Sequence, residues 1–188
     1  MRRLPLASSL AAAALAAALV PAFAAANPQK SVYSTIDLKR DCRIVKKHQD
    51  GNSWSCKGLT GYPLYVAEGD LRFFVSAGAS PEKRRAATQT LAGFNSIFKD
   101  DKTNRATLEW RVANPGPKAT PYATILRYYL SVDGKKWQTL VVMKVTPTET
   151  CHVAHVDAAL PNAVAVAREI ADGAAAFDCT KEPVERKK

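Results

Sequence analysis

Residues 122–145 read YATILRYYLSVDGKKWQTLVVMKV and carry the strongest indication of the fold. Two runs rich in β-branched and aromatic residues flank the dipeptide Asp133-Gly134. This dipeptide favours a two-residue type I′ turn, because both turn positions need a positive φ that Asp and Gly tolerate. The stretch therefore predicts an antiparallel hairpin, in which Leu130 pairs with Trp137, Tyr128 with Thr139 and Leu126 with Val141.

The two faces of this hairpin differ in polarity, because successive side chains of a strand point to opposite faces. One face is expected to pack against the core and comprises Leu126, Tyr128, Leu130, Val132, Trp137, Val141 and Met143. The other is expected to be wetter and comprises Arg127, Tyr129, Ser131, Lys136, Gln138 and Lys144.

Two further hairpins are predicted upstream. In PLYVAEGDLRFFVS (63–76), a turn at Gly69-Asp70 pairs Val66 with Phe73 and Leu64 with Val75. Around QDGN (49–52), a two-residue turn at Asp50-Gly51 would place Cys42 opposite Leu59. A longer loop or a β-bulge is therefore needed if Cys42 is to face Cys56 directly.

Two helices are predicted in addition to the hairpins. Residues 80–98 combine a capping serine, Ser80, with Pro81 at the first helical position. Residues 161–177 form the second helix, which Pro161 opens. Their expected buried stripes are Ala87, Leu91, Phe94 and Phe98 in the first helix, and Val164, Ala167, Ile170 and Ala171 in the second.

Strand-like residues also fill 31–47, 105–114 and 151–157. The predicted fold class is therefore α+β, a single domain at 27–180 with one mainly antiparallel sheet of about seven or eight strands. Two helices and two disulfides complete this prediction, and residues 181–188 are expected to be a polar, frayed tail.

The N-terminus indicates export. Arg2 and Arg3 precede an apolar, alanine-rich run, and small residues follow at 22–26, so residues 1–26 are predicted to be a signal peptide. Its removal leaves 162 residues and lowers the net charge from +10 to +8. The mature chain has no apolar run long enough for a transmembrane span. We expect the protein in the periplasm or secreted.

Four cysteines fit an oxidising compartment. Three pairings are possible, and proximity in the sequence favours Cys42 with Cys56 and Cys151 with Cys179. No C-x-x-C motif supports thioredoxin-like redox chemistry.

The segment CHVAHVD (151–157) groups three side chains that can bind metal. A regular strand places Cys151 and His155 on one face and His152 on the other, so the histidines would not share an ion. A zinc site would also need further ligands. The sequence therefore predicts no metal site and no cofactor.

The sequence contains no G-x-S-x-G, H-E-x-x-H or P-loop motif. A small envelope hydrolase with dispersed carboxylates is kept as the alternative function, with Glu68, Asp70 and Glu109 as candidates. Enzymatic activity is left open, and a non-enzymatic protein is favoured.

The favoured function is an exported binding or envelope-associated domain. Its basic charge suits an acidic envelope protein or an anionic lipid or glycan, whereas export makes nucleic acid a poor partner. Arginine and tyrosine suit recognition, since they offer planar donors or an amphipathic ring. The candidate binding residues are Arg72, Arg111, Arg127, Tyr129 and Lys144.

Several strings resemble an uncharacterised family of small exported proteins from alphaproteobacteria. They are YSTIDLKRDC (33–42), GYPLYVAEGDLRFFVS (61–76), ATLEWRV (106–112), YATILRYYLSVDG (122–134) and CHVAHVDAALPNAVAVAREIAD (151–172). That family has no assigned activity, so the resemblance implies a single exported domain and carries over no catalytic or ligand residue.

Overall fold

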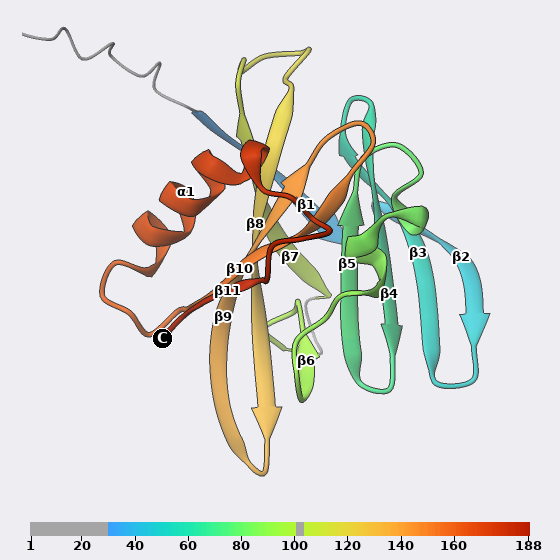
Figure 1. Cartoon of the computed structure of the whole chain (residues 1–188). Helices are drawn as coiled ribbons and strands as arrows, with labels where there is room; N and C mark the ends of the chain where they lie inside the picture. Colours follow the sequence, from blue (N-terminus) through green and yellow to red (C-terminus); the bar gives the residue numbers. More distant parts are fainter. Residues whose placement is uncertain (1–29, 101–103) are drawn as a thin grey trace, which may run out of the picture.

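Two mainly antiparallel sheets and one short helix make up the fold (Figure 1). The computed structural model describes residues 30–100 and 104–188, so the predicted signal peptide at 1–26 lies outside the described residues. The small sheet has the order β2-β3-β4-β5, with β2 at Cys42–His48, β3 at Gly51–Leu59, β4 at Tyr62–Gly69 and β5 at Arg72–Ala77.

The large sheet has the order β1-β7-β8-β9-β10-β11, and β6 pairs with β8 beside this path. Its strands are β1 at Lys30–Asp37, β6 at Phe94–Ser96, β7 at Arg105–Val112, β8 at Pro121–Val132, β9 at Lys135–Val145, β10 at Thr150–Asp157 and β11 at Glu185–Lys187. The strands therefore form two sheets, where the sequence predicted one.

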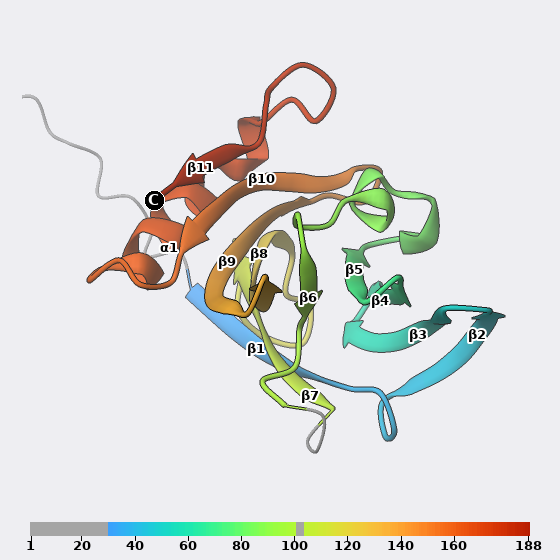
Figure 2. The same cartoon turned by 90° about the horizontal axis from the view of Figure 1, so that it is seen from below.

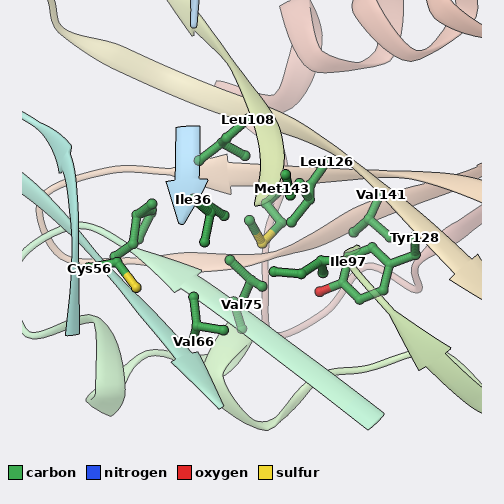
Figure 3. Close-up of a cluster of buried hydrophobic side chains, with 14 of the residues drawn as sticks. Ile36, Cys56, Val66, Val75, Ile97, Leu108, Leu126, Tyr128, Val141 and Met143 are labelled. Carbon is green, nitrogen blue, oxygen red and sulfur yellow. The ribbon is translucent and has the colours of Figure 1, made fainter. Parts of the chain in front are cut away.

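The three layers are the small sheet, the large sheet and helix α1 at Ala163–Gly173 (Figure 1). The main core lies between the sheets and draws side chains from both, among them Val66, Val75, Leu108 and Met143 (Figure 3). A second core lies between the other face of the large sheet and α1. Both faces of the large sheet are thus buried along part of its length.

The hairpin β8–β9 has the predicted register. Leu130 pairs with Trp137, and the pairs Tyr128–Thr139 and Leu126–Val141 follow. Asp133 and Gly134 have φ values of 50° and 77°, as a type I′ turn requires. The turn chemistry alone set this register, because both strands continue directly from it.

The two other hairpins turn one residue away from the predicted positions. In β4–β5 the turn residues are Asp70 and Leu71, so Val66 pairs with Val75 and not with Phe73. In β2–β3 a bulge near Val45 brings Cys42 directly opposite Cys56. The inference that this pair needs a bulge or a longer loop is confirmed.

The predicted helix at 80–98 is wrong. Two single turns of 3₁₀-helix, η1 at Pro81–Lys83 and η2 at Arg85–Thr88, are followed by strand β6. Gly93 has a φ of 83°, and a Cβ there would lie 2.2 Å from Cγ2 of Val132. Asn95 is buried and hydrogen-bonds loop carbonyls in place of a helix. These tertiary contacts override the helical spacing.

Helix α1 confirms one of the two predicted helices, with a different buried stripe. It buries Ala163, Ala167 and Ala171 at spacings of four, whereas Val164 is 40% exposed. A short 3₁₀ turn, η3 at Ala174–Ala176, follows. The small side chains let the helix lie close to the sheet, and Val166 and Ile170 flank the stripe.

Both predicted disulfides are present. Cys42 bonds Cys56 across β2 and β3, and Cys151 bonds Cys179 beyond η3. The second bridge ties the start of β10 to the C-terminal segment. That segment was expected to fray, but residues 185–187 form β11 and pair in parallel with β10.

Candidate functional site

Two of the five candidate binding residues, Arg111 and Lys144, are buried and bind other residues of this chain. The guanidinium of Arg111 is 8% exposed and donates two hydrogen bonds of 2.9 Å to the carboxylate of Asp172 on α1. The Nζ atom of Lys144 lies 2.8 Å from Oε2 of Glu149 and donates a 2.6 Å hydrogen bond to the Phe177 carbonyl. Both cations therefore join elements of this chain to one another.

Glu109, a carboxylate of the hydrolase alternative, belongs to the same internal network. Nε of Arg168 donates a 2.8 Å hydrogen bond to its Oε1 atom, and the Ser31 hydroxyl donates to that oxygen as well. Burial pushes the pKa of Glu109 upward, but these hydrogen bonds and the neighbouring guanidinium charges outweigh it and lower the pKa. Glu109 helps to hold α1 on the large sheet.

The three remaining candidates, Arg72, Arg127 and Tyr129, are partly exposed. Arg127 donates a 2.8 Å hydrogen bond to the side chain of Gln138 on β9. Tyr129 pairs with Ser96 of β6 and lines a hollow. Arg72 opens β5 directly after the β4–β5 turn. Two of these three residues, Arg72 and Tyr129, lie at hollows that border this turn.

The β4–β5 turn is strained and presents an apolar side chain. Asp70 and Leu71 have φ values of 51° and 58°, a left-handed conformation that is unfavourable for leucine. Leu71 is 60% exposed, and the neighbouring Phe94 is 51% exposed. Strain of this kind persists only where the surrounding structure holds it.

Asn95 holds this turn in place. Its backbone N–H donates to the Leu71 carbonyl at 3.0 Å, and its Oδ1 accepts from the Phe73 N–H at 3.0 Å. Its Nδ2 donates to the carbonyls of Leu91 and Gly93 at 3.1 and 3.2 Å. The backbone N–H and the side-chain amide of Asn95 thus together fix the turn and the loop before β6.

Replacing Asn95 by alanine is expected to lower the free energy of unfolding by about 2 kcal/mol, because buried partners lose their hydrogen bonds. The turn should also loosen, because the Phe73 N–H loses Oδ1 of Asn95 as its side-chain acceptor. Urea denaturation measures the first effect, and amide exchange at Leu71 to Phe73 measures the second. Unchanged exchange there would show that Asn95 does not hold the turn.

A hollow of about 530 Å³ lies on one side of the turn, and we call it the Arg72 hollow. Arg72 forms a 2.9 Å ion pair with Asp70, while its Nε is shielded from water and has no acceptor among the described residues. Glu68 also lines this hollow, and burial raises its pKa. Candidates of the binding hypothesis and of the hydrolase hypothesis therefore meet at one place.

The floor of the Arg72 hollow contains a chain of polar side chains. The hydroxyl of Tyr65 donates a 2.9 Å hydrogen bond to Oγ of Ser53, and Nε2 of His48 lies 3.2 Å from the same atom. Ser53 is only 1% exposed. The sequence contained no motif that predicts this contact, since the pairing of β2, β3 and β4 creates it.

A second hollow of about 590 Å³ lies on the other side of the turn, and we call it the Tyr129 hollow. Aromatic residues and lysines line it, and Glu68 borders both hollows. Phe73 and Phe98 contact edge to face, with ring centroids 5.3 Å apart. The residues that line it include Leu71, Phe73, Phe94, Phe98, Tyr129 and Lys136.

The prediction that His152 and His155 point to opposite faces is wrong. A bulge between His152 and Ala154 shifts the register, so both histidines pair with residues of the core face, Met143 and Val141. Nδ1 of His152 lies 3.0 Å from Nε2 of His155. One extra residue in β10 thus reverses the face on which His155 lies.

Burial governs the protonation of this pair. It lowers the pKa of His152 to about 3, with a further contribution from the charge of His155. Burial and the charge of Arg186 on β11 lower the pKa of His155 to about 4. Both rings are neutral near neutral pH, so at this contact the N–H of one ring donates a hydrogen bond to the unprotonated nitrogen of the other.

The described residues, 30–100 and 104–188, contain no cluster of three or more His, Cys, Asp or Glu side chains placed to hold a metal ion. They also contain no helix that is long and apolar enough to cross a membrane.

No family model, curated protein or solved structure matches this chain. The site therefore has to be interpreted from its own geometry. Sequence reasoning identified Arg72 and Tyr129 but missed Leu71, Phe94 and Asn95. The helical spacing predicted that Phe94 is buried. A hairpin turn predicted at Asp70-Leu71, in place of Gly69-Asp70, would have indicated that Leu71 lies at an exposed turn position.

Proposed function

We propose that this protein is an exported, non-enzymatic domain that binds an envelope protein through the surface around the β4–β5 turn. The observation that carries the proposal is Leu71, which is 60% exposed in a strained turn that Asn95 clamps. An exposed apolar side chain held by strain is costly for the isolated protein. A partner that covers Leu71 would offset this cost.

The chemistry around Leu71 resembles the centre of a protein interface. Phe94 adds a second exposed apolar side chain, and Tyr129 and Arg72 are residue types that often dominate binding energy. Lys136 lines the Tyr129 hollow, so cations border the apolar centre. This composition favours an acidic protein surface over a glycan, because a glycan offers little apolar area to cover Leu71 and Phe94.

Export rests on the predicted signal peptide and on the cysteines. The two disulfides fit a periplasmic or extracellular location, since bridges persist where thiols are oxidised. Among the described residues all four cysteines are bridged, so none offers a thiol for catalysis. Periplasmic and secreted protein can be distinguished by fractionating cells that produce the full chain.

Replacing Leu71 by aspartate is expected to weaken partner binding about 30-fold, as for a residue that dominates an interface. The partner is first identified with a photo-crosslinking amino acid at position 71 in the exported protein. The control carries the crosslinker, or aspartate, at Val164, which is 40% exposed on α1. Crosslinks of equal yield to the same proteins from both positions would overturn the proposal.

A small hydrolase is the second candidate, favoured by the Arg72 hollow. There Glu68, whose pKa is raised by burial, lies in the same hollow as the Ser53–His48 contact. A carboxyl with a raised pKa can donate a proton, and a serine beside an imidazole can act as a nucleophile. A fluorophosphonate probe that labels Ser53, with loss of labelling in His48→Gln, would make hydrolysis the leading function.

A further inference from the structure

Strand β2 is an edge strand that the core does not cover. It pairs only with β3 among the described strands, and all six residues from Arg43 to His48 are exposed. Figures 1 and 2 both place it at the outer end of the small sheet, far from α1. A strand exposed on both faces gains little from burial, so its side chains are available for contacts outside the molecule.

The charge around β2 is mainly positive, and Asp41 and Asp50 are the acids of the segment 38–59. The exposed cations of the β1–β2 turn and of the β2–β3 hairpin are Lys39, Arg40, Arg43, Lys46, Lys47 and Lys57. Of these, Arg40 lies 3.9 Å from Asp37 and 3.7 Å from Asp41. Arg43, Lys46 and Lys47 form no ion pair within the described part of the chain. The net charge of +10 is therefore partly concentrated here.

Two aliphatic side chains lie among these cations. Ile44 is 49% exposed and Val45 is 45% exposed, and Val45 occupies the bulge of β2. The disulfide between Cys42 and Cys56 covalently holds β2 beside β3. The hairpin thus presents apolar and basic side chains on a fixed backbone.

Lysines and a bulge on an edge strand also prevent unwanted pairing with another strand. That role explains Lys46, Lys47 and the bulge, but it does not explain Ile44 and Val45, which would increase the risk of pairing. A soluble anionic glycan would engage the cations and gain little from the two aliphatic residues. A lipid surface uses both, because cations contact head groups while apolar side chains enter the boundary below them.

We infer that the basic β2–β3 hairpin and the β1–β2 turn dock onto the surface of an anionic lipid bilayer. Each cation near such a surface strengthens binding about fivefold at low salt. Salt should weaken the attraction, because ions screen exposed charges. This docking surface uses other side chains than Leu71, although its His48 end borders the Arg72 hollow, and it does not depend on the proposed binding of an envelope protein.

Co-sedimentation of the processed protein with vesicles tests the inference. Vesicles of equal parts phosphatidylglycerol and phosphatidylcholine are compared with vesicles of phosphatidylcholine alone, at low and rising salt. The double variant K46Q/K47Q is expected to bind the anionic vesicles about 30-fold more weakly than the unchanged protein. The matched control is K118Q/K181Q, which removes two exposed lysines elsewhere and should lose much less affinity.

A second variant separates lipid from glycan. Ile44→Ser keeps every cation and is expected to weaken vesicle binding severalfold, since it removes apolar area from the contact. Binding of that variant to soluble polygalacturonate should be unchanged. Equal losses in K46Q/K47Q and K118Q/K181Q would overturn the inference, because attraction would then be unspecific. Polygalacturonate binding as tight as vesicle binding, with no effect of Ile44→Ser, would assign the surface to a glycan.

These results also separate the two proposals. Leu71→Asp should abolish capture of the envelope protein and retain most of the vesicle binding, because it leaves every cation of the hairpin, and Ile44 and Val45, in place. K46Q/K47Q should do the reverse. Vesicle binding that requires Leu71 and not Lys46 and Lys47 would overturn the assignment to the hairpin.

Discussion

Replacing both Cys151 and Cys179 by alanine is expected to lower the free energy of unfolding by about 3.5 kcal/mol, from the loop that this bridge closes. The bridge spans 28 positions and joins β10 to the segment after η3. That segment supplies the Phe177 carbonyl to Lys144 and carries β11. Its detachment would leave the buried Lys144 with Glu149 alone and expose the edge of β10.

Urea denaturation of the oxidised protein and the double alanine variant measures this effect. The matched comparison is the bridge between Cys42 and Cys56, for which the same loop model gives about 3 kcal/mol. We expect a smaller loss of global stability there, because β2 is exposed and can detach without opening the core. Equal losses for the two pairs would show that β2 unfolds only together with the rest.

Local chemistry accounts for what the sequence predicted well. The Asp133-Gly134 turn set the register of β8–β9, because nothing intervenes between the turn and the paired residues. The two disulfides followed from proximity along the chain. Each of these features depends on residues that are close in sequence, which is where pattern reasoning is strongest.

Long-range contacts account for what the sequence could not predict. Asn95 and Gly93 shape the segment after η2 through contacts with β5 and β8. The helical spacing of residues 80–98 therefore predicted a helix that does not form. The pattern placed Lys144 on the wetter face of its hairpin, whereas in the fold α1 and the segment after it cover both Lys144 and Arg111. Alternation likewise misplaced His155, because a β-bulge leaves no mark in hydrophobic periodicity.

Acid is expected to destabilise the protein well before most carboxylates are protonated. In the folded state the pKa values of His152 and His155 are about 3 and about 4, against 6.5 for a free histidine. Below pH 6.5 the unfolded chain therefore binds protons that the folded chain does not. The stability that the neutral pair contributes is complete above pH 6.5 and is lost as the pH falls towards the folded pKa values.

The magnitude follows from the same linkage. His152 is 1% exposed. Below the pKa of the unfolded chain, its protonation should lower the free energy of unfolding by about 1.4 kcal/mol for each unit by which the pH falls. His155 is less buried and should contribute less, because water screens its charge. The charged groups that line the hollow at His155 are Asp157, Arg186, Lys187 and Lys188. Glu68 opposes the trend, since its raised pKa favours the folded state as acid is added.

Urea denaturation at a series of pH values checks this expectation, with His155→Gln and the double variant H152Q/H155Q beside the unchanged protein. The slope of stability against pH between 6.5 and 4 should be shallower in His155→Gln and nearly flat in the double variant. His48→Gln removes an exposed imidazole and serves as the control. If the double variant does not fold, the single variant His155→Gln still tests the expectation. An unchanged slope in that variant would mean that the buried pair is not the source of acid sensitivity.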